Sequence, residues 1–221
     1  MKAVVFDMDG LMFNTEDVYT LVGAELLRRR GYEFTFEMKN EMMGLPPQQT
    51  FKVMIERCGL CDTWEELATE SYCLFKSFLD AHLAPMPGLM ELLDALETAR
   101  IPKAIATSSA RQLLEACLMR FDLERRFVFF LTAEDVMHGK PDPEIYLTAA
   151  ARFGLAPGEV LVLEDSQNGC RAAAAAGVFT VAVPAEHSRT HDFSSASLVV
   201  DSLADPRLYE ALGLARGDEK G

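Results

Sequence analysis

Two aspartates stand one residue apart in the stretch VVFDMDGL, directly after an apolar run and directly before a glycine. They are Asp7 and Asp9. Two carboxylates this close repel each other when both are ionised, so a fold that keeps them together must gain something from the pair. A solvated turn is the plain alternative. These acids, however, lie between a predicted buried strand and Gly10, a position that favours a functional site.

Other polar side chains follow the later apolar runs of the sequence in the same way. Hydroxyl residues come after the run KAIA, two acids come after VLVL, and a lysine occurs in HGKPDPEIY. Ligands of parallel α/β sheets bind beyond the carboxyl ends of the strands, so we expect these side chains to converge on a single edge. The residues are Thr107, Ser108, Ser109, Lys140, Glu164 and Asp165.

The elements that would position these side chains alternate between strand and helix. Apolar residues recur at three-four spacing over 89–96 and again over 113–121, which is typical of helices with one buried face. Alternation of strand and helix indicates a parallel sheet with right-handed crossovers, so the predicted fold class is α/β with helices on both faces. Short apolar runs predict buried strands at residues 2–6, 104–106, 160–163, 178–183 and, more weakly, 198–200.

The stretch 16–84 breaks this alternation, because its patterns are helical throughout. Val18, Val22 and Leu26 mark one such helical face, and further apolar residues continue the pattern toward Leu74. We therefore expect an inserted all-α cap domain over 16–84. The α/β core would comprise residues 1–15 and 85–221, and the prolines of APMPGL mark a linker where the chain returns to it.

Composition and charge limit the classes of partner. The chain has 221 residues, is 49% hydrophobic and 25% charged, and carries a formal net charge of -13. This is a globular composition, and the negative charge argues against binding to nucleic-acid phosphates. No apolar stretch is long enough to span a bilayer, and the start MKAVVFDMDG has an acid where a signal peptide would carry its apolar core. We expect a cytoplasmic protein without nucleic-acid or membrane partners, as a monomer or weak dimer.

The polar residues of the predicted edge form four motifs that resemble those of the haloacid dehalogenase-like superfamily. In order, they are Asp7-Met-Asp9-Gly10, Thr107-Ser108, Lys140-Pro-Asp-Pro and Glu164-Asp165-Ser-x-x-Gly169. One Asp-x-Asp alone is weak evidence, but four motifs in the right order cover essentially the whole chain. The chain resembles the branch of phosphatases and β-phosphoglucomutases, whose Rossmann-like core carries a helical cap inserted after the first motif.

This resemblance implies a metal site and two catalytic acids. Two carboxylates and a phosphate dianion can share a pocket only if a multivalent cation neutralises them, and oxygen ligands with phosphate select Mg²⁺. By resemblance, Asp7, Asp165 and the backbone carbonyl of Asp9 hold the ion, with Glu164 as a further metal-site residue. Asp7 would attack phosphorus and form an aspartyl-phosphate. Asp9 would protonate the leaving alcohol and then accept a proton from water.

The same resemblance assigns residues that bind the phosphoryl group. The Thr107 hydroxyl and the Ser108 amide are predicted to lie where a helix begins, so they can hold phosphoryl oxygens at the positive end of its dipole. A plain N-cap would explain only one of the neighbouring hydroxyl residues. Lys140 would supply the local cation that this acidic chain needs, pairing with Asp7 and the phosphoryl group.

Substrate choice is expected to come mainly from the cap. The stretch MMGLPPQQT resembles the substrate-facing loop of related proteins, which makes Tyr19, Met43, Gly44 and Gln48 candidates for substrate binding, with ordinary helix-turn packing as the alternative. β-Phosphoglucomutases carry a histidine shortly after the first motif and an arginine just past the cap-loop glycine. Here those places hold Tyr19 and Pro47, which weakens the mutase interpretation.

The predicted function is Mg²⁺-dependent hydrolysis of a small phosphate monoester, either a sugar phosphate or a nucleotide-related metabolite. A β-phosphoglucomutase-type reaction and a non-catalytic phosphometabolite-binding module are the alternatives. A dehalogenase is disfavoured because those enzymes need no Mg²⁺ and lack the second acid, here Asp9. A phosphonatase would need a Schiff-base lysine in the cap, and nothing in the sequence marks Lys39, Lys52 or Lys76 for that role.

Cysteines and histidines complete the set of candidate ligands. Five cysteines in a chain without a secretory signal predict free thiols, including the pair in Cys58-Gly-Leu-Cys61. His187 and His191 lie on a polar stretch with no evident third ligand, so we do not expect a metal site there. His138 is expected near the mouth of the pocket because it is close in sequence to Lys140.

Overall fold

The computed structural model describes residues 1–42 and 47–214. The chain divides into two compact units. One comprises Met1–Asn14 and Ala84–Gly221, and the other comprises Thr15–Leu83. The first contains all the strands among the described residues, and the second is helical.

A six-stranded sheet forms the centre of the first unit, in the order β3-β2-β1-β4-β5-β6, and every pair of neighbours is parallel. Val5 lies opposite Ala104 on one side and Val162 on the other, and all three side chains are fully buried. The α/β prediction is confirmed. The strands are β1 (Ala3–Phe6), β2 (Lys103–Ala106), β3 (Phe130–Leu131), β4 (Val160–Glu164), β5 (Phe179–Ala182) and β6 (Leu198–Val199).

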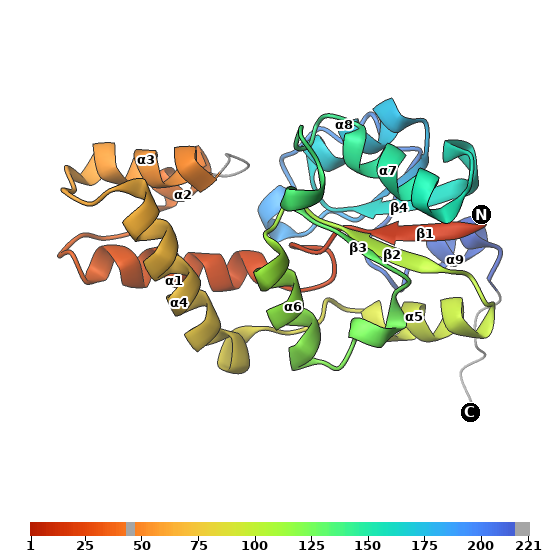
Figure 1. Cartoon of the computed structure of the whole chain (residues 1–221), viewed down its shortest axis with the longest axis horizontal. Helices are drawn as coiled ribbons and strands as arrows, with labels where there is room; N and C mark the ends of the chain where they lie inside the picture. The colour runs from red at the N-terminus through yellow and green to blue at the C-terminus, as the bar shows by residue number, and fades with distance from the viewer. Residues whose placement is uncertain (43–46, 215–221) are drawn as a thin grey trace. The chain divides into compact units, whose positions relative to one another are not determined.

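Helices cover both faces of this sheet (Figure 1), as the sequence predicts. On one face lie α7 (Glu144–Phe153) and α8 (Gln167–Ala176), and on the other lie α5 (Leu89–Thr98) and α6 (Arg111–Arg120). The buried face of α8 consists mostly of alanine, so this helix packs closely on β4 and β5. A last helix, α9 (Pro206–Leu212), follows β6.

The second unit contains α1 (Thr15–Arg28), α2 (Phe36–Met42), α3 (Pro47–Cys58) and α4 (Trp64–His82). The longest helix, α4, begins with a capping box in which Thr63 and Glu66 bond to each other's backbone amides. Helices α1 and α4 pack against each other through apolar faces. The buried residues of these faces are Val18, Val22, Leu26, Leu27, Leu67, Leu74, Phe75 and Leu79.

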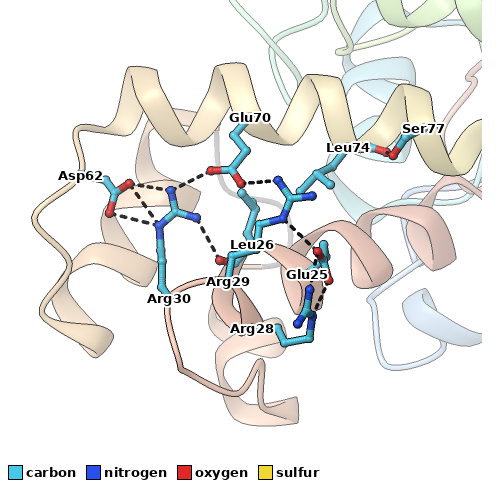
Figure 2. Close-up of polar contacts among 9 residues, drawn as sticks. All are labelled: Glu25, Leu26, Arg28, Arg29, Arg30, Asp62, Glu70, Leu74 and Ser77. Atoms are coloured by element: carbon cyan, nitrogen blue, oxygen red, sulfur yellow. Dashed lines mark hydrogen bonds and ion pairs between the residues drawn. The ribbon is translucent and has the colours of Figure 1, made fainter.

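Charged side chains connect the end of α1 to α4 (Figure 2). Arg30 forms ion pairs with Asp62 at 2.5 Å and with Glu70 at 2.7 Å, and it also donates to the Leu26 carbonyl at 3.0 Å. Arg29 reaches the same Glu70 at 3.0 Å. Arg30 is the least exposed of these charged residues, so its ion pairs are screened by solvent less than those of Arg29.

The two places where the chain enters and leaves the helical unit are hydrogen-bonded to each other. Asn14 donates its amide to the Ala84 carbonyl at 3.1 Å, and its side-chain oxygen accepts from the Ala84 amide at 2.7 Å. Met86 donates to the Met12 carbonyl at 2.8 Å. The returning segment contains Pro85 and Pro87. All five cysteines are free thiols, and among the described residues no helix has both the length and the apolar content needed to cross a bilayer.

Candidate active site

The loop after β1 places Asp7 and Asp9 at the carboxyl edge of the sheet. The Asp7 amide extends the parallel ladder by donating to Leu163 at 3.0 Å, and Gly10 then turns the chain at a φ of 75°. A Cβ at Gly10 would lie 2.5 Å from Oδ2 of Asp165 and 2.6 Å from Cε1 of His187. Glycine is therefore required at this position both for its backbone angle and for the space it leaves.

Lys140 connects the carboxyl ends of β1, β2 and β4. Its ammonium group, Nζ, donates to Oδ1 of Asp7 at 2.5 Å, to Oε1 of Glu164 at 2.6 Å and to the Ala106 carbonyl at 3.0 Å. These bonds use all three of its N–H donors. Because its side chain is only 6% exposed, water does not compete for these bonds.

Glu164 lies at the centre of this arrangement and is fully buried. Besides Lys140, its Oε1 accepts from the Tyr146 hydroxyl at 2.5 Å. Its Oε2 accepts from the Ser166 hydroxyl at 2.9 Å and from the Ser166 amide at 3.3 Å. The carboxylate therefore accepts hydrogen bonds on both oxygens, which favours a role in holding Lys140.

Burial and charge shift the pKa values of this cluster. Burial raises the pKa of Asp7 well above its usual 3.8; Lys140 opposes this shift, and the neighbouring acids add to it. Burial works against the charge of Lys140, but Asp7 and Glu164 outweigh it and hold the lysine pKa well above 10.5. Lys140 therefore remains a cation, and Asp7 lies where negative charge is crowded.

Two hydroxyl groups contact Asp9. Thr107, fully buried after β2, donates to Oδ2 of Asp9 at 3.0 Å, and Ser109 donates to the same oxygen at 2.7 Å. Ser108 lies between them and is exposed. Helix α6 begins at Arg111 with Ala110 as its N-cap, and no side chain caps it. Thr107 and Ser108 thus precede the helix, and neither is its N-cap.

Asp165 contacts a histidine that the sequence did not connect with the site. Nε2 of His187 lies 2.7 Å from Oδ2 of Asp165. His187 sits in a short 3-10 turn after β5, and Ser188 fixes that turn because its hydroxyl accepts from the Ala185 amide at 3.1 Å. His191 instead accepts from the Gln167 amide at 3.4 Å, and burial lowers its pKa.

The carboxylates of this edge fit a divalent cation. Asp7, Glu164 and Asp165 can each offer one oxygen such that the three oxygens lie within 4.8 Å of one another. An all-oxygen set of this kind suits a hard ion such as Mg²⁺. Distance alone would include Glu164, but the hydrogen bonds to both its oxygens make Asp7 and Asp165 the better candidates for ligands.

The remaining predicted residues lie elsewhere or outside the described residues. Tyr19 is half-buried in α1 with its ring centroid 5.0 Å from that of Phe75, and Gln48 is exposed in the first turn of α3. Met43 and Gly44 lie outside the described residues. His138 is exposed and bonds to Glu144. The substrate-binding roles of Tyr19, Gly44 and Gln48 remain predictions.

The chain also resembles known proteins along most of its length. It is 37% identical over 208 residues to the "Probable pseudouridine-5'-phosphatase" of Drosophila melanogaster, covering 91% of this chain and 89% of that one. It is 33% identical over 178 residues to the phosphorylated carbohydrates phosphatase of Thermotoga maritima, covering 80% and 82%. The crystal structure of a β-phosphoglucomutase from Clostridium difficile shares the fold with a TM-score of 0.76 at 20% identity, covering 96% of each chain.

A family model adds to these pairwise likenesses. The model for haloacid dehalogenase-like hydrolases matches residues 4–183, a span that runs from the first strand to the residue directly after β5. It includes Asp7, Thr107, Lys140 and Asp165, the residues that the structure brings to one edge of the sheet. The chain therefore belongs to the haloacid dehalogenase-like hydrolases.

Proposed function

We propose that this hydrolase is a Mg²⁺-dependent phosphatase that cleaves a small phosphate monoester through an aspartyl-phosphate on Asp7. The main support for this proposal is the 2.5 Å hydrogen bond from the buried cation Lys140 to Asp7. Asp165 lies close to Asp7, and Asp9 accepts a hydrogen bond from the Ser109 hydroxyl. A nucleophile, a fixed positive charge and a second acid are the groups that phosphoryl transfer between oxygens requires.

In the proposed first step, a carboxylate oxygen of Asp7 attacks phosphorus, and the bond from phosphorus to the ester oxygen breaks. Lys140 offsets the negative charge on the nucleophile and on the phosphoryl oxygens. The Thr107 hydroxyl and the Ser108 amide bind phosphoryl oxygens. A bound Mg²⁺, held by Asp7, Asp165 and the Asp9 carbonyl, would neutralise part of the phosphate charge.

Asp9 transfers the protons in both halves of this scheme. Its carboxylic acid gives a proton to the ester oxygen as the bond to phosphorus breaks, so the product leaves as a neutral alcohol. The resulting carboxylate then takes a proton from the water that attacks the aspartyl-phosphate. Inorganic phosphate leaves, Asp7 is regenerated and Asp9 is again protonated.

The substrate class we propose is a phosphorylated sugar or a nucleotide-related metabolite. The names of the two relatives support it, because one refers to pseudouridine-5'-phosphate and the other to phosphorylated carbohydrates. Within this proposal, the helical unit Thr15–Leu83 acts as a cap and sets the choice of leaving group. Tyr19, Gly44 and Gln48 are its candidate contacts, and the cytoplasm is the proposed location.

A phosphosugar mutase is the second candidate, and the shared fold with a β-phosphoglucomutase favours it. At 20% identity this likeness concerns the fold only. Tyr19 and Pro47 stand where the mutases carry a histidine and an arginine, so we rank the phosphatase first.

A screen of phosphorylated metabolites tests this ranking if it scores both released phosphate and isomerised phosphosugar. Wild-type protein with Mg²⁺ should release phosphate, and both Asp7→Asn and a chelator should abolish the release. Undiminished turnover with chelator would remove the metal-dependent mechanism. Conversion of β-glucose 1-phosphate to glucose 6-phosphate faster than hydrolysis would reverse the ranking. Metabolite binding without turnover across the panel would favour a non-catalytic module.

A further inference from the structure

We propose that Ser109 is a positioning residue for Asp9: its hydroxyl holds Oδ2, so that Oδ1 is the oxygen that exchanges the proton with the leaving group. This inference rests on the proposed phosphatase function. It adds a residue and an atom to that function, because neither the first motif nor the second specifies which Asp9 oxygen reacts.

The two oxygens of Asp9 differ in their surroundings. Oδ2 accepts from the Ser109 hydroxyl at 2.7 Å and from the Thr107 hydroxyl at 3.0 Å. Within the described part of the chain, Oδ1 is shielded from solvent and accepts no hydrogen bond. A carboxyl oxygen with two donors has both in-plane lone-pair directions occupied, so the proton of the neutral acid must sit on the other oxygen. That oxygen is Oδ1.

The position of Ser109 is fixed by its own backbone. Its amide donates to the Thr107 hydroxyl oxygen at 3.0 Å, and its carbonyl accepts from the Ala133 amide at 3.2 Å. Ala133 begins the short turn after β3, so the loops that follow two neighbouring strands hold the serine. Because the backbone of Ser109 is held at both its amide and its carbonyl, its hydroxyl group can fix the orientation of the carboxyl group that it contacts.

Thr107 and Ser109 do not remain equivalent during turnover. A hydroxyl group has a single hydrogen to donate. When the Thr107 hydroxyl turns to a phosphoryl oxygen, as the proposed function requires, its bond to Asp9 is lost. Ser109 then provides the one remaining hydroxyl contact to Oδ2, at the moment when Oδ1 must face the ester oxygen. The orientation of Asp9 in the reacting complex therefore depends on Ser109 more than on Thr107.

Three substitutions of Ser109 distinguish the effect of its hydroxyl group from the effect of its side-chain size. Ser109→Ala removes the donor, Ser109→Cys keeps the size with a weak donor, and Ser109→Thr keeps the hydroxyl group. The matched control is Ser77→Ala, which removes a hydroxyl that donates to the Leu74 carbonyl within α4. Single-turnover phosphorylation would be measured with Mg²⁺ on glycerol 2-phosphate, a poor leaving group, and on 4-nitrophenyl phosphate, which needs no proton to leave.

Complete loss of a general acid costs about 10²- to 10⁴-fold, so misorientation of Asp9 should cost about 10- to 100-fold on the alkyl ester. We expect this loss in Ser109→Ala and Ser109→Cys, with less than about 3-fold change on the nitrophenyl ester. Ser109→Thr and Ser77→Ala should stay within about 3-fold of wild type on both esters.

Equal losses on the two esters in Ser109→Ala or Ser109→Cys would overturn the inference, as would an alkyl-ester rate that is unchanged in both. An alkyl-specific loss in Ser109→Thr as large as in Ser109→Ala would assign the effect to packing and would also overturn it. If Ser109→Ala does not fold, the cysteine variant decides. Failure of the proposed function looks different, because wild-type protein would then phosphorylate on neither ester.

Discussion

Gly169→Ala should destabilise the α/β unit, although the substitution adds a good helix former to the first turn of α8. Gly169 lies in α8, and its own backbone angles are helical. Alanine is more favourable than glycine in a helix interior by about 1 kcal/mol, so propensity alone predicts stabilisation. The atoms around this glycine predict a loss of stability instead.

The magnitude follows from the contact with Glu164. A Cβ at position 169 would lie 1.9 Å from Cδ and Oε1 of Glu164 and 2.1 Å from Oε2. To reach van der Waals contact the carboxylate must move by roughly 1.5 Å, which breaks its bonds to Lys140, Tyr146 and Ser166. Disrupting a buried ion pair costs about 3 to 5 kcal/mol. After the gain in helix propensity, the net loss should be about 2 to 4 kcal/mol.

Calorimetry and urea unfolding followed by circular dichroism would measure this loss. For a protein of this length, each kcal/mol corresponds to about 2 to 4 °C in Tm, so Gly169→Ala should melt about 5 to 15 °C lower. Gly158→Ala is the matched control, because Gly158 lies within the short 3-10 helix Pro157–Glu159 and its added Cβ would meet no atom within 4 Å. We expect the control to change stability by less than about 1 kcal/mol.

A double-mutant cycle with Glu164→Ala tests the cause. If Gly169→Ala acts by displacing the Glu164 carboxylate, the alanine should cost little once that carboxylate is gone, and it should then show its helix-propensity gain. The reasoning is refuted if Gly169→Ala is as stable as wild type. It is also refuted if the loss persists unchanged in the Glu164→Ala background.

Three further predictions concern metal binding, pH and the helical unit. His187→Gln should weaken Mg²⁺ binding about 10- to 100-fold by titration calorimetry, because the histidine contacts Asp165, the proposed metal ligand, whereas His191→Gln should leave the affinity unchanged. Hydrogen bonds from Arg126 lower the pKa of Glu97 from 4.5 to about 2. The stabilising contribution of Glu97 is therefore present above pH 4.5 and is lost as the pH falls toward 2. Glu97→Gln should flatten the stability profile between these pH values, measured by urea unfolding. Arg30→Met should lower the free energy of unfolding of the helical unit by about 1 to 3 kcal/mol, because Asp62 and Glu70 lose their shared partner. The fluorescence of Trp64 would follow this unfolding, and an unchanged unfolding midpoint would count against the role of Arg30.

The pattern of apolar residues predicted most of the fold, because most of the strands are long enough and buried enough to appear as apolar runs in the sequence. The runs at β1, β2, β4 and β5 are four or five residues long, and the structure shows strands within a residue or two of the predicted bounds. The short edge strand β3 was missed, because two residues carry no periodicity. Its pairing with β2 is a tertiary effect that local sequence does not encode.

The residues of the candidate site were predictable where they directly follow strands or belong to a sequence motif. Asp7 and Asp165 were found in this way, and Lys140 came from its motif. Tyr146 lies on the buried face of α7. In the sequence, an aromatic residue on such a face cannot be distinguished from an ordinary core residue. His187 reaches Asp165 through a turn stabilised by its own loop, so its spacing in the sequence carries no signal of the contact.

The charges at this edge explain why its parts depend on one another. Lys140 contacts Asp7 and Glu164. Burial raises the pKa of Asp7, Lys140 opposes this shift, and the three neighbouring acids Glu164, Asp165 and Asp9 add to it. A nucleophile must be ionised, and a phosphate dianion would add to the same repulsion. A divalent cation opposes both effects, because it favours the carboxylate form of Asp7 and the bound phosphate together. Repulsion between the paired aspartates of the first motif therefore opposes their proximity, and the proposed cation would offset that repulsion.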